Sequence, residues 1–126
     1  HALRRFFGEQ GFDVATAGSA DEGLGLLKHE RFGLVISDYN MPGMKGTEFL
    51  RNARAVSPDT CRVILTGYAD VDMAIDSIND GAVHRFFTKP WKEEELLEGV
   101  LDAMDRQPVQ ASQDAVRAAA SQAALM

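Results

Sequence analysis

Two short runs of consecutive apolar residues constrain the fold of this chain more than any other feature. Residues 34–36 (Leu-Val-Ile) and 63–65 (Val-Ile-Leu) contain no polar side chain. Such runs are typical of parallel strands that are buried on both faces of a sheet. Two weaker runs, at 13–17 and 85–88, extend the series. Because parallel strands need crossover connections, which are usually helices, the pattern predicts an α/β domain.

The segments between these runs have apolar residues at helical spacing. Ser19 and Glu22 have the spacing of a capping box, which predicts the start of a helix that ends near Glu30. The other predicted helices cover residues 2–10, 47–56, about 70–80 and about 93–104. In sheets of this kind ligands bind at the carboxyl ends of the strands, so chemistry is expected there.

Composition narrows the class of protein. The 126 residues can bury one core, and a formal charge of −6 argues against a nucleic-acid surface, which needs clustered Lys and Arg. The single cysteine, Cys61, excludes an intrachain disulfide and a cysteine zinc cluster. No apolar run reaches membrane-spanning length. We therefore expect a cytoplasmic domain that contacts neither membrane nor nucleic acid.

Three polar residues follow three of the predicted strands. Asp38 comes after residues 34–37, Thr66 closes the run 63–65, and Lys89 follows 85–88. Each alone has an ordinary explanation, as a turn residue, a β-branched strand residue or a solvated lysine. At one edge of the sheet, however, they would supply a nucleophile, a hydroxyl donor and a positive charge, which together suit phosphoryl transfer.

Magnesium is the cofactor that such chemistry predicts, and the sequence provides only part of a site for it. Mg²⁺ takes carboxylates and waters in octahedral geometry, so Asp38 by itself is a poor site. Asp59 and Asp70 are predicted near helix starts, where capping explains them better.

Three motifs then resemble those of response-regulator receiver domains of two-component signalling. They are Leu34-Val-Ile-Ser-Asp-Tyr-Asn-Met-Pro-Gly-Met-Lys-Gly46, Leu65-Thr-Gly-Tyr68 and Phe87-Thr-Lys-Pro-Trp91. The resemblance covers residues 1–105 and implies a flavodoxin-like, doubly wound sheet with strand order 2-1-3-4-5.

The resemblance also implies a role for each matching residue. Asp38 would be the phosphoacceptor, Thr66 the switch hydroxyl and Lys89 the partner of the phosphoryl group. Phe86 would be either the switch aromatic or simply a core aromatic, and the backbone carbonyl of Asn40 would bind the metal with Asp38.

Further positions are implied in the surrounding loops. Lys89 and Pro90 would be joined by a cis peptide bond, Pro42 and Gly46 would shape the loop after the phosphoacceptor, and Asn40 and Tyr68 would tune the phosphoryl lifetime. The implied partners are a sensor histidine kinase and an output domain or partner protein, or a second copy in a homodimer, bound through the face formed by residues 70–105.

The sequence departs from the family at its start, and its composition shifts near its end. Family members begin with a central strand that ends in an acidic pair, whereas His1 matches a point within the following helix. We therefore expect the first strand and the acidic pair to be absent from this chain, because its sequence is incomplete or because it is a truncated form. Residues 106–126, rich in Ala and Gln, are predicted to form a linker helix or a disordered tail.

Two rival functions remain. Without an acidic pair, the chain could be a non-phosphorylated pseudo-receiver that acts only as an interaction module. A haloacid-dehalogenase-like phosphatase also uses an Asp nucleophile, but it needs a second Asp two residues later, where this sequence has Asn40.

Overall fold

The computed structural model describes residues 2–41, 43–105 and 122–125. Strands and helices alternate along the chain, as the apolar runs predicted. The helices are α1 (Ala2–Glu9), α2 (Ala20–His29), α3 (Gly46–Val56), α4 (Val71–Asn79) and α5 (Glu93–Asp105), with a short 3₁₀ helix at Tyr68–Asp70. The strands are β1 (Asp13–Thr16), β2 (Leu34–Asp38), β3 (Asn40–Met41), β4 (Met44–Lys45), β5 (Cys61–Thr66), β6 (Arg85–Thr88) and β7 (Gln122–Leu125). The predicted α/β class is confirmed.

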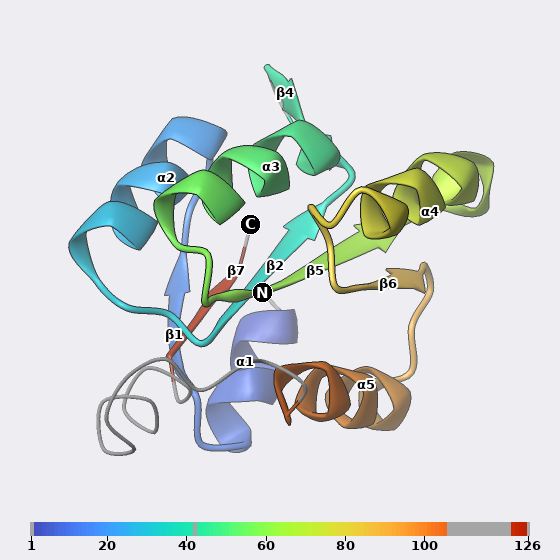
Figure 1. Cartoon of the computed structure of the whole chain (residues 1–126). Coiled ribbons are helices and arrows are strands. Elements are labelled where there is room, and N and C mark those ends of the chain that lie inside the picture. The colour runs from blue at the N-terminus through green and yellow to red at the C-terminus, as the bar shows by residue number, and fades with distance from the viewer. Residues whose placement is uncertain (1, 42, 106–121, 126) are drawn as a thin grey trace.

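A five-stranded sheet forms the centre of the molecule, with strand order β1-β7-β2-β5-β6. Every neighbouring pair in it is parallel. Helices α2, α3 and α4 cover one face, and α1 and α5 cover the other (Figure 1). This is the doubly wound arrangement expected from the sequence.

The side chains of β2 and β5 divide between two cores, one on each face of the sheet. Val35 and Ile64 pack with α2, α3 and α4, whereas Leu34, Ile36 and Val63 pack with α1 and α5. All five are almost fully buried. Burial on both faces explains why these strands have no polar alternation.

The second strand position in the sheet order is occupied by the C-terminal segment. Gln122–Leu125 form β7, which pairs with β1 over four residues and with β2 over three. The prediction of helix or disorder for the tail is therefore wrong for these four residues, which occupy the place in the sheet of the family's first strand. Residues 106–121 and 126 lie outside the described part of the chain. Residues 122–125 form a strand because β1 and β2 both have backbone N–H and C=O groups that need hydrogen-bond partners when they are buried.

The start of α2 shows that local signals predict local structure well. The hydroxyl of Ser19 accepts a hydrogen bond from the backbone N–H of Glu22 at 3.2 Å, and the Glu22 carboxylate accepts one from the N–H of Gly18 at 3.1 Å. This is capping-box chemistry, displaced by one residue on the carboxylate side.

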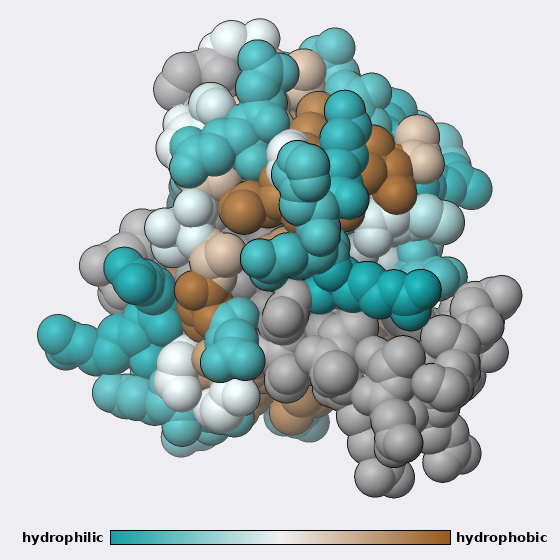
Figure 2. All heavy atoms as spheres, turned by 90° about the vertical axis from the view of Figure 1, so that its left-hand side faces the viewer, coloured by the Kyte–Doolittle hydropathy of each residue, from teal (hydrophilic) through white to brown (hydrophobic). Residues whose placement is uncertain are grey.

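The outer surface is mainly hydrophilic where it is seen from the side of α2 and β1 (Figure 2). Apolar groups show between the polar ones there, as is usual for a folded protein surface. Among the described residues, no helix has the length and apolar character that are needed to cross a membrane.

Candidate functional site

The three polar residues predicted from the strand ends lie at one edge of the sheet. Asp38 is the last residue of β2 and is in register with Leu65, and Thr66 is in register with Thr88, which precedes Lys89. Backbone hydrogen bonds continue past the strand ends, from Lys89 N to the Thr66 carbonyl at 2.9 Å. The parallel register therefore brings the three residues together, as expected.

The side chains of Asp38 and Lys89 form an ion pair between Oδ1 and Nζ. They are 40% and 44% exposed, so this charge pair remains accessible to a reactant in solution. The Asp38 Oδ1 atom itself is buried and has no regular hydrogen bond from the described residues. The lysine ammonium is therefore the group that balances its charge.

Thr66 ends strand β5, and Phe86 lies in the adjacent strand β6. Thr66 is 1% exposed, and its hydroxyl donates a hydrogen bond to the Gly67 carbonyl at 3.1 Å. Phe86 is half-buried and packs against the core on the side of α2, α3 and α4. In this arrangement the Thr66 hydroxyl is bonded to the backbone, and the Phe86 ring packs against the core as an ordinary strand side chain does.

The loop after Asp38 is a small antiparallel hairpin, formed by β3 and β4, with Gly43 at a positive φ of 79° between them. Gly46 ends this loop very close to strand β2. A Cβ atom on Gly46 would lie 2.1 Å from the Asp38 carbonyl oxygen, a distance that no side chain could tolerate. Gly46 therefore shapes the loop by close backbone approach. Pro42, predicted to act with it, lies outside the described residues.

The remaining predicted residues lie around the rim. The peptide bond between Lys89 and Pro90 is cis, as the resemblance implied. Asn40 is exposed, and Tyr68 is 76% exposed. Sequence reasoning did not single out Lys45, whose Nζ donates a hydrogen bond to Asn40 Oδ1 at 2.8 Å. This contact depends on the register of the hairpin, in which Lys45 lies opposite Asn40, and that register could not be predicted from the sequence.

The described residues do not provide a complete magnesium site. No group of three or more His, Cys, Asp or Glu side chains that could hold a metal ion occurs among them. Strand β7, the neighbour of β2, has the sequence Gln-Ala-Ala-Leu and brings no carboxylate to the edge. The Asp38 carboxylate is instead paired with an ammonium group.

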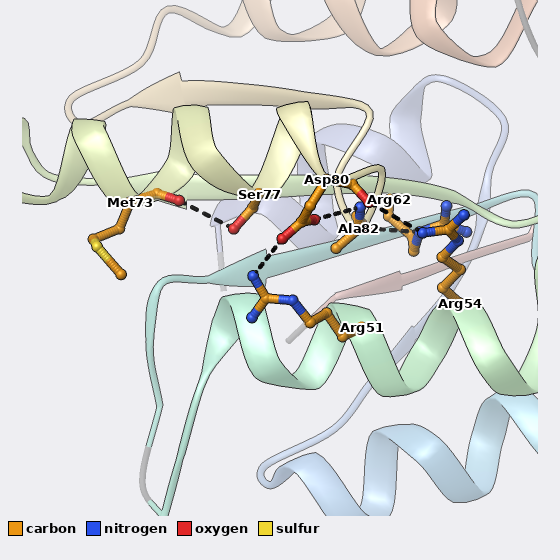
Figure 3. A network of polar contacts seen from close by, with 7 residues as sticks. All are labelled: Arg51, Arg54, Arg62, Met73, Ser77, Asp80 and Ala82. Atoms are coloured by element: carbon orange, nitrogen blue, oxygen red, sulfur yellow. Dashed lines mark hydrogen bonds and ion pairs between the residues drawn. The ribbon is translucent and has the colours of Figure 1, made fainter.

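A second polar network lies at the opposite end of β5 (Figure 3). Arg62, 3% exposed, donates hydrogen bonds to four backbone carbonyls at 2.7–3.3 Å. These acceptors belong to Pro58, Thr60, Gly81 and Ala82. Burial, and then the nearby Arg54, lower the pKa of Arg62. No sequence pattern predicts this network, apart from an arginine near the start of a predicted strand.

Arg51, Arg54 and His84 complete the network. Arg51 forms a 2.6 Å ion pair with Asp80, and Arg54 donates to the Asp80 carbonyl at 3.2 Å. The Nδ1 atom of His84 accepts the backbone N–H of Arg62 at 2.9 Å. Burial first, and then the charge of Arg62, lower the pKa of His84 to about 4. The network ties the loop after α4 to α3 and to the start of β5.

Comparisons with known proteins agree with the fold and with the motifs. Residues 1–101 match the family model of the response regulator receiver domain. The chain is 35% identical over 109 residues to the hydrogenase transcriptional regulatory protein HoxA of Cupriavidus necator, a match that covers 86% of this chain and 22% of HoxA. The chain thus corresponds to about a fifth of that relative's length.

Solved structures show the same likeness. A CheY-like receiver domain protein from Methanospirillum hungatei superposes with a TM-score of 0.76 at 28% identity, over 84% of each chain. A response regulator from Burkholderia pseudomallei, solved with a phosphorylated aspartic acid, a calcium ion and citrate, gives 0.72 at 27% identity, over 82% of this chain and 61% of that one. The match over residues 1–101 shows that this chain belongs to the response regulator receiver domain family.

Proposed function

We propose that this receiver accepts a phosphoryl group on Asp38 from the phosphohistidine of a sensor kinase. The observation that carries the proposal is the ion pair of Asp38 with Lys89 at the edge of the sheet where Thr66 also lies. A carboxylate nucleophile, a charge clamp and a hydroxyl donor are the groups that phosphoryl transfer requires of the protein. The similar response regulator from Burkholderia pseudomallei was solved with a phosphorylated aspartic acid, which supports the proposal.

The transfer would form a bond between an Asp38 oxygen and phosphorus while the phosphorus–nitrogen bond of the donor breaks. The electron pair of that bond remains on the donor imidazole. The Lys89 ammonium would move from the carboxylate to the phosphoryl oxygens, which carry more negative charge after transfer. Thr66 would exchange its bond to the Gly67 carbonyl for one to a phosphoryl oxygen. Phe86 would follow that movement.

The readout would be the face formed by residues 70–105. The large apolar side chains that are exposed within the described residues lie on this face or beside it: Tyr68 at 76%, Met73 at 50%, Ile75 at 40% and Leu101 at 45%. Exposed apolar side chains on helices α4 and α5 are available for contact with a partner. An output domain, a partner protein or a second copy of the chain would bind here.

Mass spectrometry with a small phosphodonor tests the proposal. This chain, and a longer form that includes any residues encoded next to it, would each be incubated with acetyl phosphate with and without magnesium. We expect one added phosphoryl group that is lost in Asp38→Ala and kept in the control Asp70→Ala. Absence of the added mass from both forms, or its persistence in Asp38→Ala, would exclude Asp38 as the phosphoacceptor.

A second candidate, the pseudo-receiver, is favoured by one observation: the described residues do not form a magnesium site. A pseudo-receiver would bind its partner equally well in the presence and absence of phosphodonor. Comparing partner binding by wild type and Asp38→Ala therefore separates the two functions, since only a phosphoacceptor responds to the donor.

A further inference from the structure

We propose that Lys45 is a positioning residue that lengthens the lifetime of the phosphoryl group by holding the side-chain amide of Asn40 in one orientation. This inference rests on the proposed function of Asp38. Lys45 lies opposite Asn40 in the hairpin that follows Asp38, and its Nζ donates to Asn40 Oδ1 at 2.8 Å.

The lysine is held from its other side by a buried aromatic ring. Its Nζ lies 5.4 Å from the ring centroid of Tyr39, within the range of a cation–π contact. Tyr39 is 8% exposed and is fixed by its backbone: its N–H donates to the Leu65 carbonyl at 2.8 Å, and its carbonyl accepts from Gly46 at 2.6 Å. The ammonium therefore connects a rigid part of the site to an exposed side chain.

The consequence for Asn40 is chemical as well as steric. An amide side chain has an acceptor oxygen and a donor nitrogen. Because Lys45 donates to the oxygen, one of the two acceptor positions of that oxygen is filled, and the nitrogen remains as a free donor. A donor stabilises phosphoryl oxygens, whereas a free amide oxygen could accept a hydrogen bond from water and orient it for attack.

Hydrolysis is the step that this arrangement would slow. A water oxygen forms a bond to phosphorus, the bond between phosphorus and Asp38 breaks, and the electron pair returns to the carboxylate. One proton of the water passes to solvent. With the amide oxygen occupied by Lys45, the attacking water lacks one group that could orient it.

The half-life of the phosphorylated chain tests this role. After removal of the phosphodonor, Lys45→Met should lose the phosphoryl group about 3- to 10-fold faster, the effect of one net hydrogen bond. Lys45→Arg, which keeps a cationic donor, should restore most of the half-life. Lys28→Met, on the outer surface of α2, is the matched control. Lys45 makes no side-chain capping bond at the start of α3, so no helix cap is lost.

A double variant separates the positioning role from a simple effect of charge. If Lys45 acts through Asn40, Lys45→Met should have no further effect in an Asn40→Ala background. An unchanged half-life in Lys45→Met, or an equal effect in the Asn40→Ala background, would overturn the inference.

A second measurement keeps this test independent of the proposed function. NMR relaxation of the Asn40 side-chain amide should show greater mobility in Lys45→Met than in wild type or Lys45→Arg. If the wild-type chain accepts no phosphoryl group, the proposed function fails and the lifetime role fails with it. Unchanged amide mobility would show instead that Lys45 does not position Asn40 at all.

Discussion

The two ends of strand β5 use charged groups in opposite ways. At the carboxyl end, beside Thr66, the ion pair of Asp38 and Lys89 is about half exposed. At the amino end, the Arg62 guanidinium is buried and is surrounded by backbone carbonyls that accept its hydrogen bonds. A charge saturated by fixed acceptors has no capacity left for a ligand, whereas an accessible pair can exchange one partner for another. This difference in exposure and in hydrogen-bond saturation distinguishes the structural network around Arg62 from the candidate functional site at Asp38.

The largest effect is expected from Arg62→Leu, which should destabilise the fold by about 3 kcal/mol or more. The change removes the donor from two buried carbonyls, those of Thr60 and Ala82, and from two part-buried ones, and an unpaired buried group has a substantial cost. Chemical denaturation would measure the loss.

The control for this prediction is Arg51→Leu, because the Arg51 ion pair is about half exposed at 50% and 45%. Exposed pairs contribute at most about 1 kcal/mol. If both variants lose the same stability, the distinction between a saturated buried network and exposed pairs breaks down.

An intermediate effect is expected from acid, acting through His84. Its pKa is about 4 in the folded chain, against an ordinary value of 6.5. Between these values the unfolded chain binds a proton that the folded chain does not, so stability falls as the pH falls from 6.5 to about 4 and then levels off. Above pH 6.5 the contribution is fully present.

Denaturation at several pH values checks this sign. His84→Asn keeps a hydrogen-bond acceptor but removes the titration, so its stability should depend less on pH over this window than that of wild type. The matched variant His29→Asn should follow wild type. An identical pH profile for His84→Asn and wild type would contradict the assignment.

The smallest stability effect is expected from Lys89→Met. Because the Asp38 and Lys89 side chains are 40% and 44% exposed respectively, solvent screens their attraction, and the loss should be about 1 kcal/mol at most. Phosphoryl transfer from acetyl phosphate should nevertheless slow strongly, because the charge clamp is gone. A large loss of stability would show that this end of β5 is structural too, and would remove the contrast with Arg62.

The candidate site could be predicted from sequence to the extent that it depends on strand ends. Asp38, Thr66 and Lys89 each follow an apolar run, and parallel strands bring their carboxyl ends to the same edge whatever the details of packing. The contacts of Lys45 with Asn40 and Tyr39 could not be predicted in this way, since they depend on the register of a hairpin of two-residue strands. The carbonyls around Arg62 come from two separate loops and share no sequence pattern.

The sequence by itself determined the strands predicted at 34–37 and 62–66, which the structure extends to 34–38 and 61–66, the helices between them and the order of the three rim residues. These follow from local apolar periodicity, which acts between residues a few positions apart. Only the tertiary structure decided that Gln122–Leu125 become a strand between β1 and β2. The alanines there favour a helix by intrinsic propensity, but the unpaired backbone groups of two distant strands outweigh that preference. Pairing partners that lie about a hundred residues apart leave no local signal in the sequence.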